Sequence, residues 1–265
     1  NCVIETADGV LLLGCNTSAI PDDGSVTSIG KYAFSSCTGL TNITIPESVM
    51  SIGDYAFEGC TDLMSITISD SVMKIGKGAF FNCTALTSIT IPNHIENIGD
   101  EAFRGTGLTD ITIPDRVTKI GDLAFGWCRR LTSITIPDCV ERIGNEVFKG
   151  CNELTSINYE GTKAQWKAID KGVGWRGLYD CFYTNSESGS YTVHCTDGDI
   201  VPTAENSITS GKTTTDNPTL HAVFNGLTAG EDYAVIVSKS AENPLDAANL
   251  IYINQKIPGA DGVLD

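Results

Sequence analysis

The heptapeptide LTSITIP occupies residues 86–92 and returns unchanged at residues 131–137, and close variants of it begin at Leu40 and Leu108. In its second half, serine and threonine alternate strictly with isoleucine. This alternation is typical of a strand that buries one face and exposes the other. The final proline cannot donate to a sheet ladder and is expected to end the strand. The sequence therefore predicts a set of equivalent short strands, including one within 86–92.

These strands belong to a longer repeat, which is marked by a phenylalanine that follows alanine or valine. Successive copies of this phenylalanine are 23, 23, 23, 22 and 23 residues apart. They are Phe34, Phe57, Phe80, Phe103, Phe125 and Phe148. Such regularity indicates a solenoid. In the short step FRGTGL (103–108) replaces FFNCTAL (80–86), and we interpret the missing residue as the cysteine.

Each repeat continues with a second extended stretch that ends in Ile-Gly, as at Ile52-Gly53. We expect the glycine to adopt a backbone angle that a Cβ would resist. The following segment, DYAFEGC in one copy, is interpreted as a single helical turn. One repeat buries too few apolar side chains to fold alone, so successive coils must stack, with a parallel sheet down one side and a spacing of about 4.8 Å.

The pattern L-x-x-I-x-I-P…V-x-x-I-G-x-x-A-F-x-x-C, which covers residues 26–158, resembles the BspA-like (Treponema-type) leucine-rich repeats of bacterial surface proteins. The opening NCVIETADGVLLLGCNTSAIP (1–21) is similar to an irregular unit of such arrays, and residues 157–200 resemble the module that closes them. The resemblance implies a leucine-rich-repeat solenoid over 1–159, with an irregular first unit at 1–25, and a capping module at 160–200.

The capping module carries its own sequence signals. Thr162 is placed to cap a short helix that has Trp166 and Ile169 on one face, and we expect Trp166 to pack against the last repeat. From residue 201 to residue 265 a Ser/Thr/Gly/Pro-rich stretch precedes three strand-like runs at 219–227, 231–239 and 249–257. These runs predict a small β-sandwich-like module, interpreted as an incomplete immunoglobulin-like or fibronectin-like domain.

The charge of the chain excludes two kinds of partner. A net charge of −16 and a pI near 4.4 disfavour nucleic acid and anionic membrane surfaces, which would repel the protein. No apolar run is long enough to insert in a bilayer. The first residue is Asn1 and the last residues are GADGVLD, so we expect a piece of a longer exported protein, secreted or at the cell surface, and a monomer.

Ten cysteines allow several interpretations. Five of them stand three residues after the repeated phenylalanine, and we expect them to be small buried groups with weak S–H donors. A zinc site is the alternative, although no Cys-x-x-Cys is present. Cys2–Cys15 and Cys181–Cys195 could each form a disulfide, and Cys139 has no evident partner. The five of the column are Cys37, Cys60, Cys83, Cys128 and Cys151.

Catalytic chemistry finds no support in the sequence, and neither an enzyme nor a cofactor is predicted. The three histidines, His94, His194 and His221, form no HExxH motif, and no GxSxG, Walker or dinucleotide-binding motif occurs. The segment 197–199 (DGD) is similar to the start of a calcium loop but lacks the further ligands, so a plain turn is preferred and no metal is expected.

The candidate partner-binding residues are the polar side chains that flank the central isoleucine of each strand and should point outward. They are Asn42, Thr44, Ser65, Thr67, Ser88, Thr90, Asp110, Thr112, Ser133 and Thr135. The structural interpretation is that threonine suits exposed strands and pairs well across them. The functional one is a polar strip that binds a protein or a glycan.

Two further groups complete the candidate set. Tyr32 and Tyr55 lie one coil apart and could form an aromatic patch, and the fifth coil gathers Trp127, Arg129 and Arg130. The resemblance implies non-catalytic adhesion to host matrix or cell-surface proteins. Two alternatives remain open, a spacer that presents another domain and a glycan-binding module.

Overall fold

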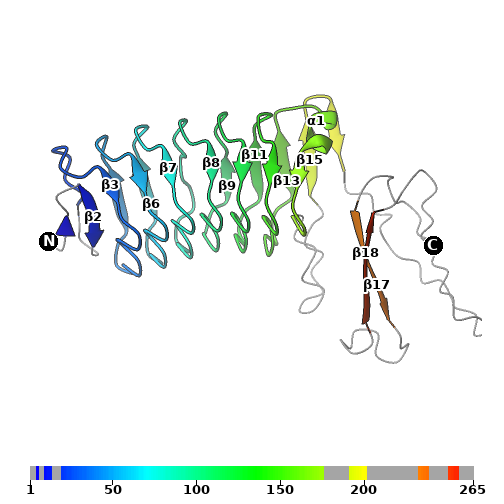
Figure 1. The fold of residues 1–265 in the computed structure, drawn as a ribbon, viewed down its shortest axis with the longest axis horizontal. Helices are drawn as coiled ribbons and strands as arrows, with labels where there is room; N and C mark the ends of the chain where they lie inside the picture. Colours follow the sequence, from blue (N-terminus) through cyan, green and yellow to red (C-terminus); the bar gives the residue numbers. More distant parts are fainter. Residues whose placement is uncertain are drawn as a thin grey trace, which may run out of the picture. The chain divides into compact units, whose positions relative to one another are not determined.

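The computed structural model describes residues 4–5, 9–13, 19–175, 191–201, 232–238 and 250–256. The chain divides into two units, residues 1–201 and residues 202–265. In the first unit successive coils stack one behind the next, from β2 (Val10–Leu13) to β15 (Thr192–Cys195), as Figure 1 shows. The predicted solenoid of short parallel strands is confirmed.

One side of the solenoid carries its longer strands, each in parallel register with the strand one repeat away. They are β4 (Asn42–Ile45), β6 (Ser65–Ile68), β9 (Asp110–Thr112), β11 (Ser133–Ile136) and β13 (Ser156–Tyr159). In β4 the two isoleucines are buried and the two polar residues are exposed. The alternation read from the sequence is therefore the alternation of the strand faces.

A second side carries strands of two residues each, which end on the isoleucine of the Ile-Gly pair in every repeat and on Lys171 in the capping region. They are β3 (Ser28–Ile29), β5 (Ser51–Ile52), β7 (Lys74–Ile75), β8 (Asn97–Ile98), β10 (Lys119–Ile120), β12 (Arg142–Ile143) and β14 (Asp170–Lys171). At the N-terminal end β1 (Ile4–Glu5) pairs antiparallel with β2, and β2 pairs parallel with β3.

The strand predicted within 86–92 is wrong, although the identical heptapeptide at 131–137 contains β11. Leu86 and Ile91 are still buried and Ser88 and Thr90 exposed, but residues 88–91 form no ladder. The second side is interrupted at the same coil boundary, since β7 ends one sheet and β8 begins another. The interruption lies beside the single 22-residue repeat, whose shorter turn draws Gly107 against the Thr84 carbonyl.

The third side of each coil is a run of tight turns, so the predicted helical turn is wrong. Backbone N–H groups alternate between two kinds of acceptor: Phe80 donates to Ala102 of the next coil at 2.8 Å, whereas Phe81 donates to Gly78 of its own coil at 2.9 Å. Two residues per coil have positive φ, at Gly78 and Asn82 in this copy (+57° for both). A helix would keep every N–H within its own coil, whereas this arrangement uses half of them to join neighbours.

The glycine of Ile-Gly is required for close approach rather than for its backbone angle, which corrects the expectation from sequence. Gly121 is absent from the residues with positive φ. A Cβ added to it would lie 2.6 Å from the backbone nitrogen of Asp100 in the preceding coil. Any side chain would therefore push two coils apart.

The core is a column of repeated side chains that runs through the stacked coils. The six phenylalanine rings stack with centroid separations of 5.0, 5.5, 5.5, 5.6 and 6.2 Å and interplanar angles of 4–17°. The leucine, isoleucine, valine and alanine positions of the repeat are buried around them. Stacked rings at this separation add to the free energy gained from apolar burial.

The cysteine column is buried beside the phenylalanines, as predicted. Each thiol from Cys60 onward donates to a phenylalanine carbonyl of the preceding coil, at 3.1 Å from Cys60 to Phe34 and 3.0 Å from Cys151 to Phe125. In the short repeat Thr106 occupies the cysteine position and is only 3% exposed. The missing residue is therefore not the cysteine but one that follows it, which corrects our interpretation of the short step.

The thiol column predicts that the protein loses stability in alkali. Burial raises the pKa of Cys60 to about 12 and that of Cys128 to about 11. In the unfolded chain a thiol ionises near pH 8.5–9, so above about pH 9 the unfolded state releases protons that the native state retains. The stabilisation is complete below the unfolded pKa and is lost as pH rises through the folded pKa.

We therefore expect the free energy of unfolding to fall by about 1 kcal/mol per buried thiol for each pH unit above about pH 9. Urea unfolding at pH 8, 9 and 10 measures this slope. The Cys60→Ala/Cys128→Ala double variant is the control and should show a shallower fall. An identical slope in the variant would show that other groups dominate the alkaline loss.

The capping residues complete the first unit. Helix α1 (Lys163–Ala168) begins at the N-cap Thr162, whose side chain and that of Gln165 form a capping box, which confirms the predicted cap. Trp166 is 3% exposed, and its ring lies 5.0 Å from that of Tyr159 at the end of β13. β15 pairs parallel with β13, and β16 (Gly198–Ile200) closes the sheet antiparallel.

In the second unit β17 (Asp232–Ser238) and β18 (Leu250–Lys256) form an antiparallel pair over seven residues each. They correspond to two of the three predicted strand-like runs. The run at 219–227 lies outside the described residues. So do Cys2, Cys15 and Cys181, and with them both of the possible disulfides.

Candidate functional site: a groove beside the short coil

The outward side chains of the longer strands form two parallel columns. Asn42 lies opposite Ser65 and Thr44 opposite Thr67, while Ser133 pairs with Asp110. The members of these columns from Asn42 to Thr112 are exposed, whereas Ser133 and Thr135 are half-buried. Because residues 88–91 form no strand, Ser88 and Thr90 share the outward face but not the ladder, and the strip is in two pieces.

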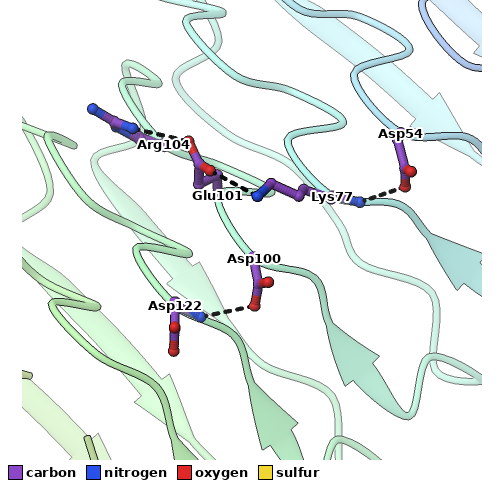
Figure 2. A network of polar contacts seen from close by, with 6 residues as sticks. All are labelled: Asp54, Lys77, Asp100, Glu101, Arg104 and Asp122. Carbon is purple, nitrogen blue, oxygen red and sulfur yellow. Dashed lines mark hydrogen bonds and ion pairs between the residues drawn. The ribbon is translucent and has the colours of Figure 1, made fainter. Parts of the chain in front are cut away.

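On the third side, the acidic and amide side chains that follow the Ile-Gly pairs have a structural role that the sequence analysis missed. Asp54 accepts a hydrogen bond from the backbone N–H of Lys77 at 3.0 Å, and Asp100 accepts from that of Asp122 at 3.0 Å (Figure 2). Asp122 in turn accepts from the N–H and the amide of Asn145, and these bonds lower its pKa. The column holds adjacent coils together rather than facing a partner.

Beside that column, Glu101 links two cations from neighbouring turns. Its carboxylate lies 3.2 Å from Lys77 Nζ and 2.8 Å from Arg104 Nη1, as Figure 2 shows. The hydrogen bond from Lys77 to Glu101 raises the pKa of the lysine. Arg104 is thereby held at the surface, with 31% of its side chain exposed.

The two predicted tyrosines lie face to face. The rings of Tyr32 and Tyr55 are 5.4 Å apart and inclined by 11°. The other side of Tyr55 lies against Gly78, and Lys31 Nζ lies 5.1 Å from the centre of the Tyr32 ring. Tyr32 is 45% exposed, so one ring of the pair is open to solvent.

The third predicted group, Trp127 with Arg129 and Arg130, lines an open groove of about 630 Å³. The rest of the lining, which was not predicted from the sequence, comes from the two preceding coils. Its other members are Phe81, Asn82, Thr84, Arg104, Gly105, Thr106 and Gly107. The signal that could have located the groove is the 22-residue step, because its shortened turn forms the floor.

Two of the three arginines in this groove are placed on aromatic rings. The guanidinium carbon of Arg104 lies 5.1 Å from the centre of the Phe81 ring, and that of Arg129 lies 5.6 Å from the indole of Trp127. At these distances the ring quadrupole attracts the cation. Trp127 also rests against Gly150 of the next coil, which fixes the indole beside the glycines of the floor.

The remaining polar candidates have partners in the capping region and, for Cys139, in the preceding repeat. Asp197 accepts from the backbone N–H of Lys163 at 2.8 Å, and His194 Nδ1 lies 2.9 Å from Asp199. Cys139, which lacked an evident partner in the sequence, donates to the carbonyls of Asp115 and Val117. Within the described ranges, no group of three or more His, Cys, Asp or Glu could hold a metal ion, and no helix is long and apolar enough to cross a membrane.

Comparison with known proteins agrees with the repeat geometry. The family model "BspA type Leucine rich repeat region" matches residues 12–132 and 118–169, in six copies. The chain belongs to the BspA-type leucine-rich repeat family. No curated protein matches it.

Solved structures extend the BspA-type likeness. A leucine-rich repeat protein from Bacteroides ovatus ATCC 8483 is 42% identical over 57% of this chain and 42% of its own, with a TM-score of 0.52. The T. pallidum leucine-rich repeat protein TpLRR is 30% identical over 67% of this chain and 86% of its own, with a TM-score of 0.59. The BspA-type chain described here thus spans less than half of the Bacteroides protein.

Proposed function

We propose that this chain is a non-catalytic binding protein, located outside the cell, that adheres to host extracellular or cell-surface proteins through the outer surface of its solenoid. Membership of the BspA-type family and its resemblance to repeats of bacterial surface proteins support this location. A solenoid offers an extended surface for such contacts. Its apolar repeat positions are buried in the core, so a partner can contact only the exposed side chains.

The observation that carries the proposal is the group formed around one groove by the half-buried Trp127 and the exposed Arg129 and Arg130. Tryptophan and arginine are enriched among the residues that dominate the free energy of protein–protein binding. The Ser/Thr columns offer hydrogen-bonding groups but none of these anchors. The tyrosine pair is a weaker candidate for glycan binding, because its inner ring is covered on both faces.

The test is binding of the purified chain to immobilised matrix proteins and cell-surface glycoproteins, with free glycans as a parallel panel, at physiological salt. We expect saturable binding to at least one protein. Thr44→Ala/Thr67→Ala, which changes only the strip, shows whether the columns take part. Binding to glycans alone would replace adhesion to proteins with glycan recognition, and no binding to either panel would favour a spacer.

A further inference from the structure

We propose that the groove beside the short coil docks an acidic segment of a partner protein, whose carboxylates are held by Arg129 and Arg130. This inference rests on the proposed function and specifies the chemistry of its partner. Three features of the groove carry it: how it is formed, how its charge is balanced, and how its arginines are held.

The groove exists because one turn is a residue shorter than the others. This turn has the single Gly107 where the other coils have two residues before the leucine. It also has Gly105, a position that is glycine in two other coils (Gly59 and Gly150), and a buried Thr106. The Thr106 hydroxyl donates to the Phe103 carbonyl at 2.8 Å and lies 3.2 Å from the Cys128 sulfur. The floor is therefore mostly backbone, with larger side chains rising from the coils on either side.

The charge of this groove is opposite to that of the molecule. It is lined by three arginines and by no carboxylate, on a chain with a net charge of −16. Arg104 is paired with Glu101 at 2.8 Å, whereas Arg129 and Arg130 form no ion pair within the part of the chain that the structure describes. Two exposed guanidinium groups are thus available to an anion, and each can bind a carboxylate with two parallel hydrogen bonds.

The position of the arginines favours a peptide carboxylate over a carboxylated sugar. A sugar needs an open aromatic face on which to rest, but the indole of Trp127 has Gly150 against it and the guanidinium of Arg129 near its ring centre. The guanidinium of Arg104 lies over the ring of Phe81 in the same way. The rings therefore orient Arg104 and Arg129, and an oriented Arg129 loses less conformational entropy when an anion binds.

The size of the groove is also consistent with a short segment. The groove is open, and its volume of about 630 Å³ leaves room for a few side chains of a docked segment. Asn82 and Thr84 add an amide and a hydroxyl to the lining. These groups can bond to the backbone of an extended peptide while the guanidinium groups bind its carboxylates.

The experiment is a fluorescence-anisotropy titration of the full chain with a labelled synthetic peptide of alternating Glu and Leu, at physiological salt. We expect the Arg129→Gln/Arg130→Gln variant to bind this peptide at least tenfold more weakly than the wild type. The matched control is Arg116→Gln/Arg142→Gln, which also removes two exposed arginines, both of them outside the groove. This control should leave the affinity for the peptide unchanged. Arg130→Lys should lower the affinity in part, because lysine keeps the positive charge but cannot form the two parallel hydrogen bonds of a guanidinium group.

Equal weakening by Arg116→Gln/Arg142→Gln and by the groove variant would overturn the proposal, since both remove two positive charges and the response would then be to overall charge. So would the absence of peptide binding, or binding of a glucuronate oligosaccharide in its place. The peptide titration tests whether the groove binds an acidic segment, and the matrix panel tests whether the chain adheres to host proteins. Peptide binding with a negative matrix panel would leave the groove assignment standing without the adhesin.

Discussion

Phe80→Ala is expected to lower the free energy of unfolding by about 3–5 kcal/mol. Phe80 is fully buried and stacks on Phe57 and Phe103 at 5.5 Å on each side, so its removal leaves a cavity and ends two ring contacts at once. The site has little room to collapse, because the coil spacing is fixed by the hydrogen bonds to the next turn. Urea or thermal unfolding followed by far-UV circular dichroism measures the loss.

The matched control for this variant is Thr90→Ala, an exposed position in the following repeat. It removes a side chain with no structural contact in the core and should change stability by less than about 0.5 kcal/mol. A small effect of Phe80→Ala, comparable to that of the control, would mean that neighbouring coils close the gap and that the ring column is not what joins them.

Trp166→Ala should destabilise the solenoid by a similar amount, about 3–5 kcal/mol. The indole covers the end of the last repeat, where it lies 5.0 Å from the Tyr159 ring and 5.7 Å from that of Trp175. Lys171 lies over both indoles and donates to the Trp166 carbonyl. Without Trp166 the apolar end of the stack is open to water, which terminal repeats must prevent.

Lys167→Ala tests the same helix without touching the cap, since Lys167 is exposed. It should unfold close to the wild-type midpoint, whereas Trp166→Ala should unfold at a lower denaturant concentration. An unchanged midpoint for Trp166→Ala would refute its role as the cover of the last repeat.

The buried columns could be predicted from the sequence because they depend only on periodicity. Leucine, isoleucine and phenylalanine recur at fixed offsets, and in a stacked coil a fixed offset is a fixed position in space. The cap at Thr162 could be predicted for a related reason, since the capping box is a local pattern.

Features that depend on the approach of two coils could not be predicted. The heptapeptide LTSITIP forms a strand at 131–137 and none at 86–92, so its own residues do not decide the outcome. Gly121 looked like a residue needed for its angle, but it is needed for its lack of a side chain. The groove likewise needed three coils in place: Trp127, Arg129 and Arg130 were singled out by composition, whereas Phe81 and Arg104 join them only through the shortened turn.

The interruption of both strand ladders at one coil boundary has a mechanical consequence. Between the coils of Phe80 and Phe103 the backbone bonds that remain are those of the turn side, from Gly78, Phe80 and Asn82, and a long one of 3.4 Å from Gly107 to Cys83. If a tensile load pulls the ends of residues 19–175 apart, this boundary resists with fewer bonds than its neighbours and is where rupture begins. Each coil of 23 residues that then peels away releases roughly 80 Å of slack. Under tension the protein can thus lengthen by unfolding single coils at this boundary while the remaining coils keep their fold.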